Sequence, residues 1–429
     1  MNKRILIHIP MFSQGEYDIF SQYNPIELLD VVNLNYKGTS PNFGNRLWFQ
    51  GLISSLQNEG TQVEYFSPHM TKEYINSNYE LIIAPMANIF AVGFKSLLES
   101  LYERFIGIKI PVYVIACGVQ AKNYDDLDEL CRAIKTSASK FISCIYNTGG
   151  EFALRGYFTK EFFDRLGFSS AVVTGCPSMY QLGRGLLISN DKVEKKDFHP
   201  IFNGTPKHYM KELQRYKKSI FIDQNVYFQE LWNPEFYNSH NDNKGILKYL
   251  IKSYGLSTVK LLLEDRIKLI PDMNMWREYL IQEGYTFSYG ARIHGNIMSI
   301  LAGIPALVEC RDARTREMAE FFELPHINLD EGNRTTSLYN LYQNCNYEKF
   351  NKNFSMHFDN YQAFLRRCGI VEKINEKNLF FDSKVVDFEI STTYTQRKKV
   401  LELLNKSKCI WSGYDKILTT KRKIFYMGN

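Results

Sequence analysis

The sequence predicts an α/β protein made of two alternating units that face each other across a cleft, followed by a helical C-terminal extension. Short β-rich runs alternate with helical patterns in both halves of the chain, which is typical of parallel sheets covered by helices. A charged stretch without periodicity separates the two halves. The 429 residues also exceed one ordinary core, because the length prior is about 150 residues per domain.

The first unit is predicted to span residues 1–188 and to begin with a strand at residues 4–9. After a long polar loop, a helical pattern runs from Asn42 to Leu56. The alternation of strand and helix then continues to the end of the unit. The runs that we assign to strands lie at residues 62–65, 81–84, 112–116, 141–145 and 171–174, with a helix around residues 159–166.

The charged stretch at residues 189–218 is predicted to be a linker. A second α/β domain is expected over residues 219–335, where a strand-like run at residues 219–222 opens the unit and a helical pattern covers residues 275–282. Residues 336–429 are polar, show helical periodicity and lack βα alternation. They are therefore predicted to form the helical extension.

The composition indicates a globular protein, since 45% of the residues are hydrophobic and 23% are charged. A net charge of +6 is too small to indicate a nucleic-acid partner without a basic cluster. The eight cysteines form no Cys-x-x-Cys pair and no zinc spacing, which favours reduced thiols in the cytoplasm. The N-terminus shows no signal-peptide pattern, and no apolar run reaches the roughly 18 residues of a membrane span, so we expect a cytoplasmic protein.

Much of the positive charge lies near the end of the chain, where it is mixed with aliphatic and aromatic residues. This pattern is compatible with peripheral contact with an anionic membrane, at the inner face, and a solvated basic helix is the simpler alternative. Both interpretations stay open. The basic positions concerned are residues 397–399, 406, 408 and 421–423.

The most informative segment is a strand-to-helix turn within residues 287–310. A run rich in aromatic residues ends at Gly290, and an apolar helical pattern follows until Gly303. Arg292 and His294 should therefore lie at a helix N-terminus, where free N–H groups and the helix dipole favour anions. The turn should also lie at the carboxyl edge of a sheet, where ligands usually bind.

A second junction of the same kind follows at residues 310–317. Neighbouring parallel strands would bring both junctions to one sheet edge, and a cluster of cationic or protonatable groups there would suit a small dianion or trianion. The groups expected to converge are Arg292, His294, Arg311, Arg314 and Arg316.

An alternative without a binding role also fits the pattern. In it, Arg314 and Arg316 pair with carboxylates on an exposed helix face, and His294 is a helix-cap residue whose hydrogen bonds are satisfied. The carboxylates available to them are Asp312, Glu317 and Glu320.

The motifs of these junctions resemble a known family. Arg-Ile-His-Gly at residues 292–295, Gly-Ile-Pro at 303–305, the run at 312–317 and Glu-Leu-Pro at 323–325 closely resemble the C-terminal signature of the polysaccharide pyruvyl transferase family. The resemblance covers roughly residues 40–330. Segments that agree with it in order are residues 42–45, 115–120, 152–155 and 173–178.

Two positions depart from the family's pattern. Cys176 stands where the family usually has an aspartate before proline, which leaves the role of that carboxylate open. Arg314 stands where a lysine is common, and this change keeps the charge while adding a planar fork for anions.

The resemblance implies a fold and an activity. It implies two Rossmann-like domains arranged as in GT-B glycosyltransferases, with the acceptor on the N-terminal side and the donor anion on the C-terminal side. It also implies transfer of the pyruvyl group of phosphoenolpyruvate to a sugar of a polysaccharide or lipid-linked glycan precursor. The reaction forms a pyruvate ketal and releases phosphate during exopolysaccharide or capsule biosynthesis. We expect neither a cofactor nor a metal.

The residue pattern and the family resemblance together indicate which residues would form the active site. Arg292 and His294 are the candidate catalytic residues, with His294 as a general acid/base or phosphate ligand. Arg155 would complete an anion clamp from the opposite domain. The candidate substrate-binding residues are Arg155, Arg314, Asn45, Gly118, Gln120 and Gly295.

Two other functions stay open at this stage. A GT-B glycosyltransferase would use the same cationic turn to bind a nucleotide-sugar diphosphate. A catalytically silent carbohydrate-assembly protein would keep the fold, and Cys176 is the residue that favours it.

Overall fold

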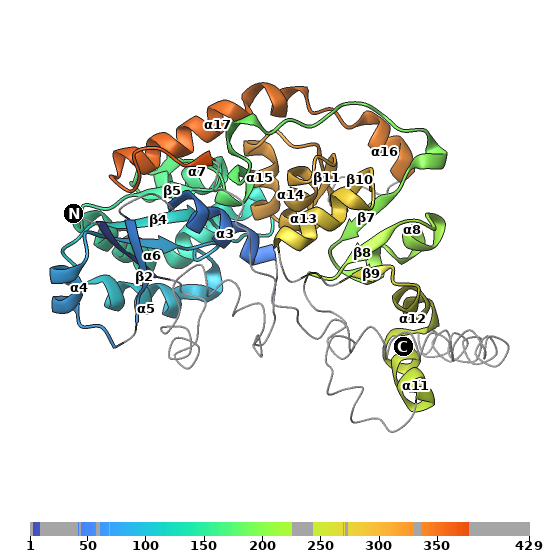
Figure 1. Ribbon diagram of the computed structural model, residues 1–429. Helices are drawn as coiled ribbons and strands as arrows, with labels where there is room; N and C mark the ends of the chain where they lie inside the picture. The colour runs from blue at the N-terminus through green and yellow to red at the C-terminus, as the bar shows by residue number, and fades with distance from the viewer. Residues whose placement is uncertain are drawn as a thin grey trace.

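The computed structural model describes residues 3–8, 42, 44–56, 61–67, 69–224, 243–268, 270, 273–329 and 336–376 (Figure 1). Within these residues it contains two parallel six-stranded sheets, ordered β2-β1-β3-β4-β5-β6 and β12-β11-β10-β7-β8-β9. Helices pack against both sheets, so the predicted α/β class with two Rossmann-like units is confirmed. We call the first sheet with its helices the N-terminal lobe (residues 3–188) and the second the C-terminal lobe (residues 200–329).

The N-terminal lobe is built on strands whose central members are buried on both faces, as in parallel sheets covered by helices. Its strands are β1 (Lys3–Ile7), β2 (Thr61–Tyr65), β3 (Leu81–Pro85), β4 (Val112–Cys117), β5 (Phe152–Leu154) and β6 (Val172–Val173). Its helices are α3 (Gly44–Leu56), α4 (Lys72–Asn78), α5 (Lys95–Phe105), α6 (Leu127–Asn147) and α7 (Tyr157–Arg165), followed by the 3-10 turn η3 (Pro177–Tyr180).

One predicted strand of this lobe is wrong. Residues 141–145 lie inside α6, a helix of 21 residues, and Phe141, Ile142 and Ile145 form part of its buried face. A short apolar run does not distinguish a strand from the buried stripe of a helix. Here the helical pattern that surrounds the run is long enough to identify it as part of a helix.

The C-terminal lobe repeats the architecture with shorter strands. Its strands are β7 (Pro200–Asn203), β8 (Ile220–Ile222), β9 (Ile267–Lys268), β10 (Phe287–Gly290), β11 (Ala306–Cys310) and β12 (His326–Asn328). Its helices are α8 (Met210–Arg215), α11 (Asn243–Tyr254), α12 (Leu256–Leu263), α13 (Met273–Gln282), α14 (Ile293–Leu301) and α15 (Ala313–Phe321).

The expectation of a linker over residues 189–218 needs correction. β7 pairs in parallel with both β10 and β8, so it is a central strand of the second sheet, and α8 follows it. Pro200 begins the strand, a position where the missing N–H is tolerated. Four buried residues between charged segments are too few to produce a periodic signal, which explains why the strand was not predicted.

The described part of the C-terminal extension is helical, as predicted, and it joins the lobes. α16 (Leu338–Asn344) lies on the C-terminal lobe, and α17 (Glu348–Arg367) runs back over the N-terminal lobe (Figure 1). There the ring of Tyr361 stacks on Tyr180 with centroids 4.9 Å apart. The basic segment for which membrane contact was predicted lies outside the described residues.

The lobes share a hydrophobic core. One buried cluster contains residues of both sheets together with the inner faces of α3, α14 and α17. α3 packs closely on η3, because a Cβ on Gly51 would lie 2.7 Å from the Pro177 carbonyl carbon. Glycine is therefore the residue that permits this approach of helix to backbone.

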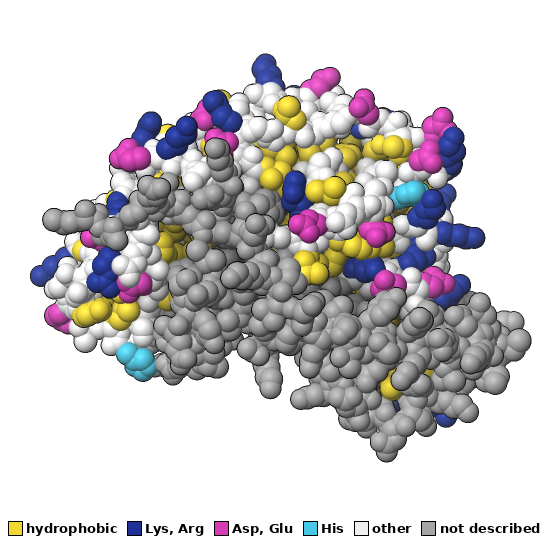
Figure 2. Space-filling model, in the orientation of Figure 1, with side chains coloured by type: hydrophobic (Ala, Val, Ile, Leu, Met, Phe, Trp, Pro, Cys, Tyr) yellow, Lys and Arg dark blue, Asp and Glu magenta, His cyan; other side chains and the backbone are white. Residues whose placement is uncertain are grey.

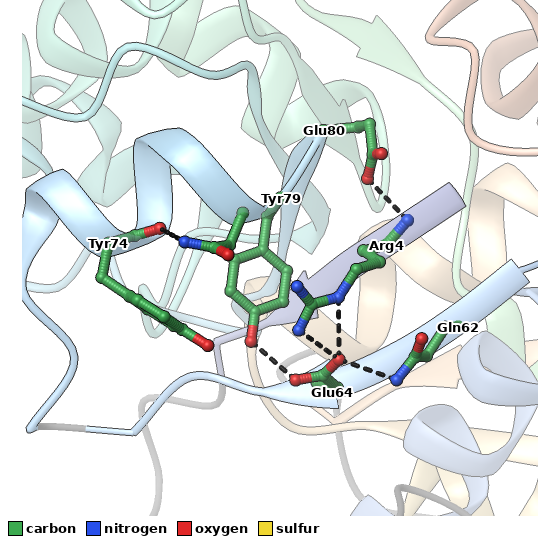
Figure 3. Close-up of polar contacts among 7 residues, drawn as sticks. Arg4, Gln62, Glu64, Tyr74, Tyr79 and Glu80 are labelled. Carbon is green, nitrogen blue, oxygen red and sulfur yellow. Dashed lines mark hydrogen bonds and ion pairs between the residues drawn. The ribbon is translucent and has the colours of Figure 1, made fainter. Parts of the chain in front are cut away.

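A polar network ties the edge of the N-terminal sheet to α4 (Figure 3). The Glu64 carboxylate accepts hydrogen bonds from Arg4 Nη2 at 2.8 Å, from the Tyr79 hydroxyl at 2.7 Å and from Gln62 Nε2 at 3.0 Å. The Arg4 guanidinium also lies 4.6 Å from the Tyr79 ring centroid. The network contains none of the predicted site residues and connects β1, β2 and the end of α4.

The surface in Figure 2 shows acidic and basic side chains interspersed over the described residues. Within the described residues one arginine, Arg155, is almost fully buried, with 2% of its surface exposed. No helix in the described part of the chain has both the length and the hydropathy that a membrane crossing requires.

Candidate functional site

The predicted strand-to-helix turn is present. β10 ends at Gly290, and α14 begins at Ile293 with Arg292 as its N-cap residue. The neighbouring strand β11 is parallel to β10 and leads into α15, whose N-cap is Asp312. Both junctions therefore lie at the same carboxyl edge of the sheet, as the sequence indicated.

Buried amides fix the shape of this turn. The Arg292 N–H donates to Asn203 Oδ1 at 3.0 Å, and Asn203 Nδ2 donates to Asn296 Oδ1 at 2.9 Å. Asn296 Nδ2 in turn donates to the Gly290 carbonyl at 2.9 Å. The turn is thus held by side chains from β7 and α14.

The first N–H groups of α14 stay available to a ligand. Ile293, His294 and Gly295 open the helix, so their N–H groups have no acceptor within it. Among the described residues no side chain or carbonyl takes these three hydrogen bonds. Together with the positive end of the helix dipole, they favour an anion at this point.

A second helix N-terminus meets the first. A Cβ on Gly44, the first residue of α3, would lie 2.9 Å from His294 Cβ and 2.7 Å from Gln224 Nε2. The Gly44 N–H donates to Asn42 Oδ1 at 3.1 Å, and Gln224 Nε2 donates to the same oxygen at 3.0 Å. Two helix dipoles therefore direct their positive ends toward the surroundings of His294.

Three guanidinium groups lie close enough to His294 for their charges to act on it. Arg155 follows β5 in the N-terminal lobe, whereas Arg292 and Arg314 belong to the C-terminal lobe. Burial lowers the pKa of His294 most, and the charges of Arg155, Arg314 and Arg292 lower it further, to well below its usual value. The imidazole is therefore neutral near pH 7 in the free protein.

Two of these arginines have buried nitrogen atoms without partners. Arg155 donates to Asn88 Oδ1 at 3.2 Å, but its Nε and Nη2 have no acceptor among the described residues. Arg314 pairs with Asp312 at 3.0 Å and leaves its own Nε without one. Buried cationic donors without acceptors are costly, so the arrangement fits a bound anion that would accept these hydrogen bonds.

Two cations expected in the cluster lie elsewhere. Arg311 pairs with the buried carboxylate of Glu309. Arg316 pairs with Glu320 at 2.7 Å and lies over the Tyr124 ring, 4.3 Å from its centroid. The prediction of five converging groups is therefore wrong for these two, and Arg155 is the group that joins from the other lobe.

The remaining candidate residues differ in their distance from the cluster. A Cβ on Gly118 would lie 3.3 Å from Arg155 Cδ, and a Cβ on Gly295 would lie 2.8 Å from Gln224 Oε1, so both glycines line the site closely. Asn45 is in the first turn of α3, where its N–H donates to the Asn42 carbonyl at 2.8 Å. Gln120 is exposed, and its N–H donates to the Phe90 carbonyl at 2.9 Å.

Cys176 lies directly beside the candidate acid/base. Its Sγ is 4.0 Å from His294 Nε2, and the Ser178 hydroxyl donates to this sulfur at 3.1 Å. All three side chains are buried. Of the two residues that depart from the family pattern, Cys176 therefore contacts the imidazole itself.

Sequence reasoning missed Asn203 and Gln224. Asn203 is the last residue of β7, and Gln224 follows β8 by two residues, so both stand at carboxyl ends of strands. That position signals a ligand site in a parallel sheet. For Asn203 this signal was hidden because β7 had been assigned to a linker, whereas for Gln224 it was present after the predicted strand at residues 219–222 and was overlooked.

No three metal-ligating side chains come together among the residues that the structure describes. The donors at the turn are guanidinium, amide and N–H groups. These groups bind anions.

The fold and the site define an α/β protein with two parallel sheets and a cationic strand-to-helix turn at the edge of the second. The family model described as polysaccharide pyruvyl transferase matches residues 42–308, which is more than half of the chain. The chain belongs to the polysaccharide pyruvyl transferase family, and it is a transferase of the kind that moves pyruvyl groups to polysaccharides.

Several solved structures are similar to the chain at low identity. A UDP co-structure of MnaA from S. aureus has a TM-score of 0.39 at 10% identity and covers 87% of this chain and 98% of its own. A putative UDP-N-acetylglucosamine 2-epimerase from Listeria monocytogenes has a TM-score of 0.34 at 10% identity, with 88% and 94% covered. The glycotransferase of kitacinnamycin has 0.32 at 9% identity, with 88% and 99% covered. The curated proteins gave no match, and the assignment rests on the family model.

Proposed function

We propose that the protein transfers the pyruvyl group of phosphoenolpyruvate to a sugar of a polysaccharide or lipid-linked glycan precursor, forming a pyruvate ketal and releasing phosphate. The observation that carries this proposal is that the charges of Arg155 from one lobe and of Arg292 and Arg314 from the other all act on the buried His294. Phosphoenolpyruvate carries a phosphate and a carboxylate on one small frame. A cluster of several cations, with buried nitrogens on Arg155 and Arg314, suits such a ligand.

The donor would be held by charge-assisted hydrogen bonds. Arg292 and the free N–H groups of α14 would hold one anionic group, and the unpartnered nitrogens of Arg155 and Arg314 would hold the other. Arginine forms planar, bidentate contacts with carboxylate and phosphate. Because the cations come from both lobes, the donor would bridge them.

The reaction needs two proton movements. The donor's methylene carbon gains a proton, one sugar hydroxyl attacks the oxocarbenium-like carbon, and phosphate leaves as its C–O bond breaks. A second hydroxyl then closes the ketal. Of the two hydroxyl protons, one ends on the new methyl group and the other on phosphate, so no outside reductant or oxidant is required.

His294 would relay one of these protons. Its pKa is low in the free protein because of burial and three nearby cations. A bound dianion would offset those charges and raise the pKa, which lets the imidazole accept a proton from a sugar hydroxyl and pass it on. One positioned acid/base group typically contributes about 10²- to 10⁴-fold in rate.

Activity measurements test this proposal. Phosphate release from phosphoenolpyruvate with a glycan acceptor should fall by about tenfold or more, at least about 1.4 kcal/mol, in His294→Ala and in Arg292→Ala. Arg316→Ala is the matched control, since that arginine pairs with Glu320 away from the cluster. It should stay within about threefold of the parent. Near-parental rates in both site variants would remove these residues from the chemistry.

A ligand screen separates the two other candidate functions. Phosphoenolpyruvate at about 100 times its Kd should stabilise the protein by about 2.7 kcal/mol, whereas nucleoside diphosphates should not. The reverse preference would favour a glycosyltransferase. Cys176 stands beside His294 where the family usually has an aspartate, and this departure favours a catalytically silent protein. Any phosphate release that depends on the acceptor would dismiss that candidate.

A further inference from the structure

A buried glutamate crosses from one lobe to the other next to the cationic cluster. Glu317 belongs to α15 of the C-terminal lobe and is only 1% exposed. Its Oε2 accepts a hydrogen bond from the Thr159 N–H at 2.9 Å, and its Oε1 accepts one from the Thr159 hydroxyl at 2.9 Å. Thr159 is the third residue of α7, so a carboxyl group of one lobe caps a helix of the other.

The contact continues into the loop after β4. While its hydroxyl donates to Glu317, Thr159 Oγ1 accepts a hydrogen bond from the Val119 N–H at 3.0 Å. A Cβ on the adjacent Gly118 would lie 3.6 Å from Glu317 Oε1. The carboxyl group thereby holds the Gly118 loop as well as the start of α7.

The backbone at Gly156 packs directly against Glu317, where a residue with a side chain would collide with it. A Cβ on Gly156, the N-cap residue of α7, would lie 3.0 Å from Glu317 Cβ, from its carbonyl oxygen and from Oε2. Such distances are tighter than ordinary van der Waals contact. The lobes therefore meet here in a fitted contact of glycine backbone with a glutamate side chain.

Arg155 lies within this contact. It directly precedes Gly156, and its Cδ is 3.3 Å from the place of a Cβ on Gly118. Arg314 lies three residues before Glu317 on α15, which is about one helical turn. Glu317 thus connects the turn that carries Arg155 to the helix that carries Arg314.

We propose that Glu317 is a positioning residue, which holds Arg155 of the N-terminal lobe in place opposite Arg314 and His294 of the C-terminal lobe. The inference deepens the proposed function and rests on the anion site described there. Glu317 would not touch the donor itself. Its effect would reach the donor through Thr159, the Gly118 loop and Arg155.

The hydrogen bonds between Glu317 and Thr159 should persist in both protonation states of the carboxyl group. Burial raises the pKa of Glu317 to about 7, against the opposing effects of Thr159 and Arg155. Near neutral pH a share of the molecules therefore carries the protonated form. A carboxylic acid has one oxygen that can accept from the Thr159 N–H and one O–H that can donate to the Thr159 hydroxyl oxygen. A glutamine amide has the same pair, with its NH₂ group as the donor. Glu317→Gln should consequently preserve the link, and Glu317→Leu should remove it.

Donor binding and kinetics test the inference. In Glu317→Leu, calorimetric Kd and KM for phosphoenolpyruvate should rise by about tenfold or more, with a smaller change in kcat. Glu317→Gln should stay within about threefold of the parent. Glu320→Leu is the matched control, because Glu320 lies on the same helix and also contacts the other lobe through the Tyr124 hydroxyl, but is exposed. Glu320→Leu should bind the donor like the parent. A loss of stability alone does not change the affinity of the molecules that remain folded, so weaker binding in Glu317→Leu would reflect a displaced Arg155.

If Glu317→Leu does not fold, Thr159→Val tests the same inference. It keeps the shape of the side chain and removes the hydroxyl between Val119 and Glu317, so binding should weaken by about fivefold or more. Parental affinity in the folded leucine variant, or in the valine variant, would overturn the inference and leave the proposed function intact. If the parent protein binds neither phosphoenolpyruvate nor inorganic phosphate, the proposed function and the inference fail together.

Discussion

At the scale of the residue, the surroundings of His294 decide what the site can do. The pKa of His294 lies well below the 6.5 of an unfolded chain, because burial and three arginines disfavour the charged form. The unfolded chain then binds the proton more readily than the folded protein. The contribution of His294 to stability is therefore complete above about pH 6.5 and is lost as the pH falls below it.

Cys176→Asp should raise the pKa of His294. The Cys176 sulfur lies 4.0 Å from Nε2, and a carboxylate within such a distance typically raises the pKa of a histidine by about 1–3 units. The pKa is measured from the NMR titration of the imidazole C–H resonances. Cys176→Ser is the control, since it places a small hydroxyl there and no carboxylate, and it should leave the titration in place. Identical titrations in the aspartate and serine variants would show that this position does not control the imidazole.

The sequence predicted part of the residue-scale arrangement. Arg292 and His294 followed from the strand, glycine and helix pattern around one turn. Arg316 was misplaced because residues two positions apart on a helix point about 200° away from each other, so Arg314 and Arg316 do not face one site. Arg155 is far from the turn in sequence, and it was expected from the opposite lobe because of the family resemblance, since no local pattern around the turn predicts it.

At the scale of the element, α3 sets the position of the site. Its N-terminus meets His294 at Gly44, and its middle packs on η3 at Gly51. The fit at Gly51 is against backbone atoms, which move less easily than a flexible side chain. The register of α3 along η3 consequently sets where its N-terminus meets α14.

Gly51→Ala should destabilise the protein by about 1–3 kcal/mol, the usual cost of forcing extra volume into a packed interior. The new Cβ would lie 2.7 Å from the Pro177 carbonyl carbon. Urea unfolding gives the free energy of unfolding. Gly93→Ala is the control, because a Cβ there would meet no atom within 4 Å. Equal unfolding midpoints for the two variants would contradict the packing described for α3.

Elements were predicted best where their periodicity was long. The helix over residues 44–56 and the strand, turn and helix over residues 287–301 match the sequence patterns. β7 escaped prediction because four residues provide little periodicity, and the strand inside α6 was assigned from an apolar run that a buried helix face produces equally well. The length of the whole element, and not of its apolar run, distinguishes a strand from a buried helix face.

At the scale of the whole molecule, the two lobes form one packed unit around the site. A continuous hydrophobic cluster contains residues of both lobes, and α17 returns to the N-terminal lobe, where Arg367 pairs with Glu151. The sequence predicted two α/β units and a helical extension. It did not predict this return, because the contact of Tyr361 with Tyr180 depends on the final arrangement of the lobes.

The central claim is that cations from both lobes hold one anion, and calorimetric binding of phosphoenolpyruvate tests it most directly. Arg155→Met and Arg314→Met should each weaken binding by about tenfold or more. The double variant should lose less than the sum of the two free-energy changes, because both groups serve the same ligand. Each change also removes one contact, the bond of Arg155 to Asn88 or the ion pair of Arg314 with Asp312, so circular dichroism should first show that each variant is folded. Unchanged affinity in Arg155→Met, with binding lost only in Arg314→Met, would contradict a site shared between the lobes.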